Sequence, residues 1–419
     1  MIRRLGIFMA LVGVFALGAA DATIEIVKSS TKLPNVSVEH IADNKEYGEK
    51  VVAQLIGDLK VSNHFQALKA SEPKKSPDFE SYKARRIDLI AQVSITKSSN
   101  NVSGNLIVYD VNKKTLVIDK QYAQIPLKQY PFIAHKMCID MNAYIKAPNI
   151  DWMLEPVLLS KYTSSGNTTI ALADYTLSYQ NDIIKGGMNI FPKWGDRNKS
   201  FFYYTKYINK KPTIVRYDLN TGVSQGLVSS DGMAVVSDVS TDGKKILMTL
   251  TPADNAADIF LYDVASRSLR KITGFSGIDV GGKFINNNTK VAFISDRLGY
   301  PNVFATGIDG GNVEQVVFHG RNNSAITTHD QYIAYTSRET NNEFGQNTFN
   351  IYLISTKSDY IRRLTENGRN QMPSFSKDGK NLMFIKYTPT QSALGIIRLD
   401  YNSSYFFSLP KVKIQAYDW

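Results

Sequence analysis

The sequence has almost no cysteine, and this scarcity limits how the chain can be held together. Its 419 residues include a single cysteine, Cys138, so no disulfide can form within the chain. Histidine is scarce as well, and the five residues are scattered without metal-ligand spacing: His40, His64, His135, His319 and His329. We interpret His135, which falls in a predicted helix, as a structural histidine rather than a catalytic base.

Several motifs that carry chemistry are also missing. The sequence contains no H-E-x-x-H zinc motif, no phosphate-binding loop and no calcium-loop spacing. Gly274-Phe275-Ser276-Gly277 approaches a nucleophile turn, but its second glycine stands one position early, so we interpret the segment as an ordinary turn. The sequence thus predicts a protein that is not an enzyme, with no catalytic residue, no cofactor and no bound metal.

The N-terminus lacks an apolar run long enough to cross a membrane. Arg3 and Arg4 precede an uncharged run of 13 residues, 5–17, and small residues follow at 18–20. This pattern is typical of a secretory signal, with cleavage after Ala20 or Ala22, and is too short for a comfortable membrane span. Because no cysteine lies near the cleavage site, we expect no lipid anchor. We therefore predict a signal peptide at 1–22 and an exported mature chain without a membrane span.

Acidic residues are in the minority. Lys and Arg number 49 against 38 Asp and Glu, which gives a formal charge of +11, or about +9 once Arg3 and Arg4 are removed (11 minus 2). Export argues against a nucleic-acid partner, so we interpret the excess as solvated surface charge. Hydrophobic residues at 43% and charged residues at 21% are typical of a soluble globular protein and exclude a disordered or polytopic membrane chain.

Residues 23–150 predict a small mixed α/β domain. Alternating runs indicate strands at 24–27, 36–41, 65–68, 87–95, 105–111 and 115–122. A first amphipathic helix carries an apolar stripe made by Tyr47, Val51, Leu55 and Leu59. Asp43 and Glu46 are predicted to form its capping box. A second helix, over about 130–145, buries Met137 and Cys138, to which we assign core roles only.

Residues 151–419 carry an internal repeat. Runs rich in Ile, Val, Tyr and Phe are broken by Gly, Asn and Asp about every ten residues, which indicates β-hairpins. Six of these runs end at positions 174, 218, 263, 309, 355 and 400, in steps of 44, 45, 46, 46 and 45. A second register consists of Trp194, Val239, Phe284, Ile326, Phe375 and Tyr417. Because Asp-Gly and Thr-Gly turns separate the runs, a helical solenoid is excluded, and six four-stranded blades of a β-propeller are predicted.

The two registers also predict how the ring closes. The first repeat begins at Val157 without the strand that should precede it, while Tyr417 occupies an inner-strand position with nothing after it. We predict that residues 412–419 supply the innermost strand of the first blade. The alternative is a frayed C-terminal tail.

The repeat resembles that of the TolB family of periplasmic propellers. The resemblance lies in residues 293–304 (FISDRLGYPNVF), which Asp309-Gly310-Gly311 follows, and in residues 373–380 (PSFSKDGK). The family also has a signal peptide, an α/β domain and six blades, in that order, so the resemblance covers nearly the whole mature chain. The proline of the repeat is kept only at Pro192 and Pro373, which leaves exact loop lengths open.

This resemblance implies a non-enzymatic scaffold of the Tol-Pal system. Proteins of the family connect the inner-membrane Tol complex to the outer membrane, maintain that membrane and help it constrict during cell division. The propeller would bind the peptidoglycan-associated lipoprotein Pal, and the mature N-terminus would bind TolA. We expect a periplasmic monomer with no nucleic-acid partner.

The loops that lead into the inner strands are the predicted Pal-binding face. Three of the five loops contain a methionine, which suits protein recognition when exposed, whereas the alternative is that these side chains pack between blades. The candidate residues are Met188, Asn189, Ile190, Met233, Val235, Asp279, Val280, Asn322, Asn323, Gln371 and Met372.

The resemblance places TolA recognition just after the signal. The segment alternates apolar and polar side chains, as in an edge strand that a partner can extend, and the alternative is an ordinary edge strand. Its residues are Thr23, Ile24, Glu25, Ile26, Val27 and Lys28.

A rival interpretation is an exported propeller that binds a small molecule or a metal in its channel. Asp231 and Asp279 are the loop acids that would hold such a metal. A propeller attached to a hydrolase is disfavoured, because the first domain has only about 125 residues, too few for that class of enzyme.

Overall fold

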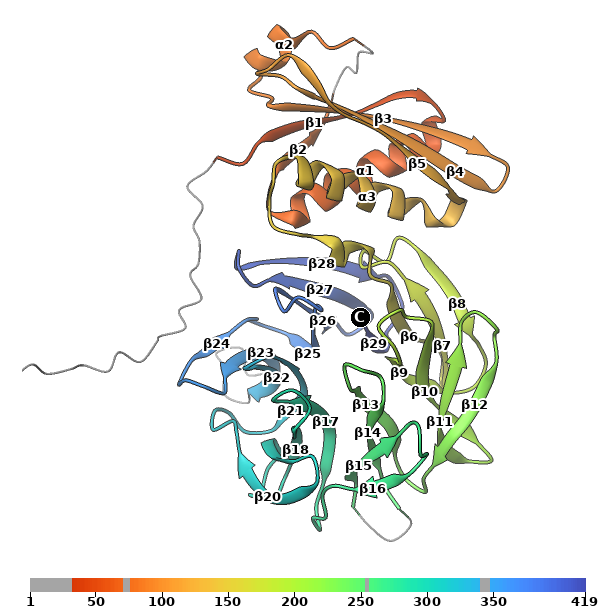
Figure 1. Cartoon of the computed structure of the whole chain (residues 1–419), viewed down its shortest axis with the longest axis vertical. Helices are drawn as coiled ribbons and strands as arrows, with labels where there is room; N and C mark the ends of the chain where they lie inside the picture. Colours follow the sequence, from red (N-terminus) through yellow and green to blue (C-terminus); the bar gives the residue numbers. More distant parts are fainter. Residues whose placement is uncertain (1–31, 71–75, 253–255, 340–346) are drawn as a thin grey trace, which may run out of the picture.

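The computed structural model describes residues 32–70, 76–252, 256–339 and 347–419, which form two domains. In Figure 1 the N-terminal domain lies above a ring of small sheets, and the C-terminus lies near the centre of that ring. The predicted signal peptide, the first predicted strand and the proposed TolA-binding segment lie outside the described residues. The mixed α/β domain followed by a β-propeller is confirmed.

A five-stranded mixed sheet forms the N-terminal domain. Its order is β2-β1-β3-β4-β5, with β1 parallel to both of its neighbours and the remaining pairs antiparallel. The strands are β1 Asn35–Asp43, β2 Gln66–Lys69, β3 Leu89–Ser98, β4 Asn101–Asp110 and β5 Thr115–Pro126. Alternate residues of β4 are buried, as expected for a sheet with one covered face.

Two long helices, α1 (Lys45–Ser62) and α3 (Tyr130–Tyr144), cover one face of this sheet together (Figure 1). The predicted stripe of α1 is buried at Val51, Leu55 and Leu59, and Cys138 on α3 is buried too. The capping prediction was wrong by one residue: Asn44 is the N-cap, and its side chain accepts the backbone N–H of Tyr47.

The remaining helical segments are short. Helix α2 (Phe79–Ala84) was not predicted, because six residues are too few to show a helical period. A 3-10 turn, η1 (Leu127–Gln129), leads into α3, and a second one, η2 (Asp151–Leu154), lies in the linker to the propeller.

The propeller has six four-stranded antiparallel blades. Counted from the channel outward, the first blade consists of β29 (Ile414–Asp418), β6 (Val157–Ser164), β7 (Asn167–Ala173) and β8 (Gln180–Ile184). The second consists of β9 (Asn189–Trp194), β10 (Phe201–Ile208), β11 (Lys211–Asp218) and β12 (Ser224–Ser229). The third consists of β13 (Ala234–Val239), β14 (Lys245–Leu250), β15 (Asp258–Asp263) and β16 (Leu269–Lys271).

The other three blades follow the same order. The fourth blade consists of β17 (Asp279–Ile285), β18 (Lys290–Ser295), β19 (Asn302–Gly307) and β20 (Gly310–Gln315). The fifth consists of β21 (Asn323–His329), β22 (Tyr332–Glu339), β23 (Thr348–Ser355) and β24 (Ile361–Arg363). The sixth consists of β25 (Arg369–Phe375), β26 (Asn381–Tyr387), β27 (Ser392–Arg398) and β28 (Ser403–Leu409). The first sequence register marks the third strands, and the second marks the inner strands. Apolar clusters fill the spaces between neighbouring blades.

The last strand closes the ring, as predicted. Strand β29 pairs antiparallel with β6, with Tyr417 opposite Leu159 and Asp418 opposite Leu158. Ile414 and Tyr417 are buried, so the strand belongs to the core and is no frayed tail. The first and the last strand of the propeller therefore belong to the same blade.

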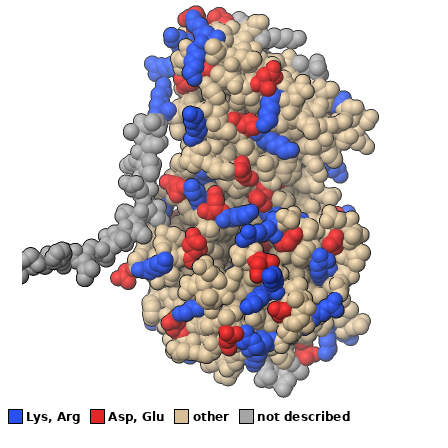
Figure 2. Space-filling view, viewed as in Figure 1, with Lys and Arg blue, Asp and Glu red and all other residues tan. Residues whose placement is uncertain are grey.

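Surface charge is mixed on the face drawn in Figure 2. Lys and Arg side chains are interspersed with Asp and Glu over both domains. Among the described residues no helix combines the length and the apolar character needed to cross a membrane.

Deleting residues 411–419 should lower the melting temperature by about 10 °C or more, because it removes the buried Ile414 and Tyr417 and opens the ring. Thermal unfolding followed by circular dichroism measures this change. Lys413→Ala is the matched control, since its side chain is exposed while its backbone carbonyl still accepts the N–H of Tyr162. An unchanged melting curve for the deletion would contradict the closure.

Candidate functional site

The inner strands of all six blades surround a narrow channel. A cavity of about 200 Å³ inside it is lined by residues from β9, β13, β17, β21, β25 and β29. Of the predicted partner-binding residues, Val235 and Met372 line this cavity. The others lie at or next to the start of the inner strands, so the predicted loops gather around one end of the channel. We call this end the mouth.

Every inner strand is interrupted near the mouth by a shift in its pairing with the second strand. Four residues at the shifts have left-handed backbone: Phe191 (φ 52°), Gly281 (φ 68°), Ala325 (φ 45°) and Met372 (φ 56°). Bulges of this kind re-aim side chains, and the three non-glycine residues carry local strain, which is common at functional sites. Sequence reasoning missed Phe191 and Ala325, because only Gly281 signals such a backbone.

Three of the predicted mouth residues are buried and hold their own loops in place. The Asn189 side-chain amide donates to the carbonyl of Gly186 (2.9 Å). Asn323 does the same to the carbonyl of His319 (2.8 Å). Asp279 forms a two-point ion pair with Arg297 (3.0 and 3.1 Å). These side chains shape the mouth, and the residues around them are more exposed.

The exposed side chains of the mouth are mainly apolar. Met233 is 40% exposed, and Met188, Ile190 and Val280 are partly exposed. On the neighbouring rim, Leu298 is 60% and Phe318 is 80% exposed, and both line a hollow next to Gly320 and Arg321. Sequence reasoning did not single out Leu298 or Phe318. Exposed apolar side chains on this scale are typical of a surface that binds another protein.

Both loop acids of the metal alternative are already paired with a cationic side chain. Asp231 forms an ion pair with Lys211 (2.6 Å), and Asp279 is occupied by Arg297. Within the described ranges, no three His, Cys, Asp or Glu residues come together as metal ligands would.

Two segments whose sequences resemble a nucleophile turn have ordinary structural roles. Gly274-Phe275-Ser276-Gly277 lies in the loop before β17. A second segment, Gly222-Val223-Ser224-Gln225-Gly226, has the full G-x-S-x-G spacing and escaped the sequence analysis. Its serine is exposed on β12, the outermost strand of a blade, whereas a nucleophile turn connects a strand to a helix.

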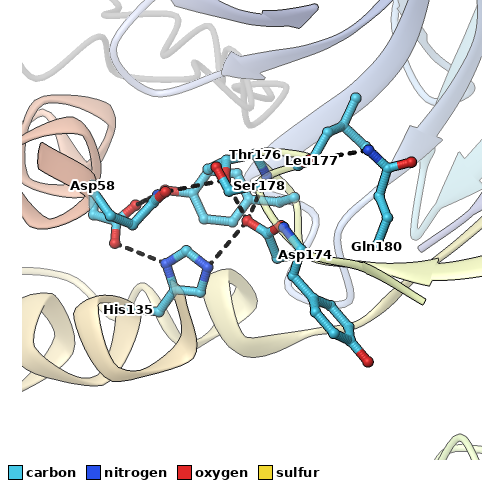
Figure 3. A network of polar contacts seen from close by, with 10 residues as sticks. Asp58, His135, Asp174, Thr176, Leu177, Ser178 and Gln180 are labelled. Carbon is cyan, nitrogen blue, oxygen red and sulfur yellow. Dashed lines mark hydrogen bonds and ion pairs between the residues drawn. The ribbon is translucent and has the colours of Figure 1, made fainter. Parts of the chain in front are cut away.

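The two domains meet at a buried network of charged and polar side chains (Figure 3). His135 on α3 places Nδ1 2.7 Å from a carboxylate oxygen of Asp58 on α1. Its Nε2 lies 3.4 Å from a carboxylate oxygen of Asp174, which follows β7 in the propeller. The Tyr175 hydroxyl donates to the other Asp58 oxygen (2.5 Å). All four side chains are buried, so the network connects the two long helices α1 and α3 to the first blade.

The charges in this network favour a protonated His135. Burial alone would lower the pKa of His135, but the negative charges of Asp58 and Asp174 outweigh it and raise the pKa to about 9. Burial likewise acts to raise the pKa of Asp174, while the hydrogen bond and charge of His135 hold it below its usual value. The structural role predicted for His135 agrees with this geometry. Its partners were not predicted, because they come from distant parts of the sequence.

Further polar contacts surround the network at the same junction. Asn63 donates to the Ser403 hydroxyl (2.7 Å), and the Tyr405 hydroxyl donates to the carbonyl of Lys60 (2.9 Å). His64 Nε2 lies 2.6 Å from the Tyr401 hydroxyl. A single apolar core continues from the N-terminal sheet into the first and last blades. The junction is therefore both polar and apolar, which fixes the orientation of the domains.

Comparisons with known proteins cover both domains. Residues 22–117 match the TolB amino-terminal domain, and residues 157–419 match the TolB beta propeller domain. The Tol-Pal system protein TolB of Helicobacter hepaticus is 52% identical over 421 residues, covering 100% of each chain. That of Wolinella succinogenes is 51% identical over 423 residues, covering 99% of this chain and 100% of its own.

A solved structure shares the whole fold. TolB from Acinetobacter baumannii covers 92% of this chain and 97% of its own chain, with a TM-score of 0.74 at 18% sequence identity. This likeness concerns the fold alone.

Replacing His135 with Gln should lower the melting temperature by about 5 °C or more, because Asp58 and Asp174 then face a neutral group in a buried site. The pKa of His135 is raised, so its stabilising effect is complete below about pH 6.5 and is lost as the pH rises through about 9. The difference in melting temperature between wild type and variant should therefore shrink across this range. His329→Gln, at the partly exposed end of β21, is the control. A difference that does not depend on pH would contradict a charged His135.

Proposed function

The chain belongs to the TolB family, and from this membership we propose that it joins the Tol proteins of the inner membrane to the outer membrane by binding two partners. Members of this family are periplasmic, non-enzymatic components of the Tol-Pal system. The proposed partners are Pal, at the propeller mouth, and TolA, at the mature N-terminus. The chain would act as a monomer that supports outer-membrane integrity and constriction during cell division.

The observation that carries the Pal proposal is the apolar mouth of the channel. The linker residues Asp151 and Glu155 line a cavity of about 750 Å³ at the other end of the inner strands, together with Trp194 and Phe375. The mouth lies where those strands begin, so the linker leaves it uncovered. An adaptable apolar surface held by rigid blades suits a folded protein partner.

The mouth offers both flexible and fixed groups to such a partner. Met188, Met233 and Met372 come from three different blades, and their unbranched side chains can adapt to an apolar surface. The loops themselves are held by buried contacts such as that of Asn323. Little of the binding energy is then lost in ordering the loops.

Replacing Met188, Met233 and Met372 together with Ala should weaken Pal binding about tenfold or more, because apolar contact area is lost at the centre of the footprint. Isothermal titration calorimetry with purified Pal measures the affinity. The Met372 carbonyl accepts the Tyr417 hydroxyl through the backbone, so the variant keeps this contact. Val223→Ala, which truncates an exposed apolar side chain on the loop before β12, is the control. Unchanged affinity in a folded triple variant would refute this footprint.

The TolA proposal concerns residues 23–28, which lie outside the described residues. It rests on the family and on the alternation of Ile24 and Ile26 with polar neighbours, which suits pairing with a partner strand. The segment stands a few residues before β1, the first described strand of the N-terminal domain. A partner bound there would be distinct from one bound at the mouth.

A mature chain that begins at Ser29 should lose TolA capture and keep Pal capture, because only the N-terminal segment is removed. A pull-down from solubilised envelope, with bound proteins identified by mass spectrometry, tests both partners in one experiment. A length-matched variant with Gly and Ser at positions 23–28 separates the effect of sequence from that of length. Retained TolA capture by both variants would reject the proposal.

A further inference from the structure

Three consecutive blades carry a charged residue at the same position of their inner strands. These residues are Lys193, Asp238 and Lys283, which follow one another at intervals of 45 residues. Each stands directly before the register residue of its inner strand, which is Trp194, Val239 or Phe284. Lys193 and Lys283 line the cavity of about 200 Å³, and Asp238 lines the larger cavity beyond it. The repeat thus brings two ammonium groups into one confined channel.

Lys193 is neutralised by the closing strand. Its Nζ lies 2.7 Å from one Asp418 oxygen and 4.0 Å from an Asp238 oxygen. The second Asp418 oxygen accepts the backbone N–H of Trp194 (2.8 Å). The second Asp238 oxygen accepts the backbone N–H of Phe284 (2.9 Å). Both oxygens of Asp418 are therefore already hydrogen-bonded, whereas Asp238 is hydrogen-bonded on one oxygen and has only the 4.0 Å contact on the other.

Lys283 has no such partner. Its ammonium donates to the backbone carbonyl of Ser237, and no carboxylate of the described chain lies within 4.0 Å of it. An ammonium has three donors, so two of its N–H groups have no acceptor among the described residues. Burial lowers the pKa of Lys283 to about 8, and the charge of Lys193 adds to this.

The surroundings of Lys283 indicate which kind of ligand would accept its two free N–H groups. The wall of the cavity includes apolar side chains such as Phe191, Val235 and Met372 beside polar ones such as Thr327, and Val235 and Met372 belong to the mouth. A single negative charge on a short aliphatic stem matches both the free N–H donors and this wall. A dianion would meet the negative charge of Asp418 on the same wall.

We propose that the channel at Lys283 is a carboxylate-binding site, which receives either a small organic acid or an acidic side chain of the protein bound at the mouth. The site itself stands on the channel geometry. Only the second source of the carboxylate rests on the proposed Pal function.

The pKa of Lys283 tests the site directly. Labelling with ¹³C,¹⁵N-lysine makes each side-chain Cε–Nζ pair visible by NMR without changing the amine, and Lys283→Arg identifies its resonance. Acetate at about 50 mM should raise the pKa of Lys283 by about half a unit or more relative to equal chloride, because a bound carboxylate favours the charged amine. Lys244, an exposed lysine on a turn away from the cavity, is the control and should not respond.

Purified Pal provides the second arm. A rise in the pKa of Lys283 with Pal but not with acetate assigns the carboxylate to the partner, and a rise with acetate assigns a site for free acids. Pal that merely covers the mouth would dry the channel and lower the pKa, so a fall overturns the partner source. No rise with either probe overturns the site. Failure of Pal to bind at all refutes the proposed function, while the acetate arm still decides the site.

Discussion

The pairing of β29 with β6 is the contact on which the propeller depends. It joins the last strand of the chain to its first blade and closes a loop of some 250 residues, which costs conformational entropy. Contacts to three blades offset that cost. Tyr417 donates to the carbonyl of Met372 in the last blade, and Gln415 accepts the N–H of Phe191 in the second. The closing strand therefore holds the mouth as well as the ring.

The same strand sets the electrostatics of the channel. Asp418 is the closest carboxylate to Lys193, so without β29 that lysine would have only Asp238, at 4.0 Å. The strand also brings Trp419 against Trp152 of the linker, with ring centroids 5.8 Å apart. Ring closure, channel charge and the position of the linker are thus consequences of one pairing, and a defect in it would affect all three.

The fold could be predicted from the sequence, because the pattern of strands and turns that specifies it repeats along the chain. Six repeats with Asp-Gly turns specify blades, and the missing first strand together with the surplus last one specifies the closure. Short or single features escaped: α2 has too few residues for a period, and the choice of Asn44 over Asp43 as N-cap depends on where the chain leaves β1.

The site could be predicted only in part. The loops at the mouth follow from the repeat, but the left-handed backbone at Phe191 and Ala325 has no sequence signal, since neither is a glycine. The partners of His135 come from another helix and from the propeller, and only the packing of the two domains brings them together. Pairing of charges across domains and blades is a three-dimensional property that no local pattern contains.

Stability does not account for Lys283. Lys283 is partly buried, and a partly buried charge without a close counter-charge costs free energy. Lys193 offsets its own cost through Asp418, whereas Lys283 donates to a backbone carbonyl and is attracted by Asp238 and Asp418 only at longer range. The blade repeat itself does not require a lysine there either, because the corresponding positions on β21 and β25 hold Ala325 and Ser374. A carboxylate bound in the channel would therefore compensate this ammonium at closer range than Asp238 or Asp418 does.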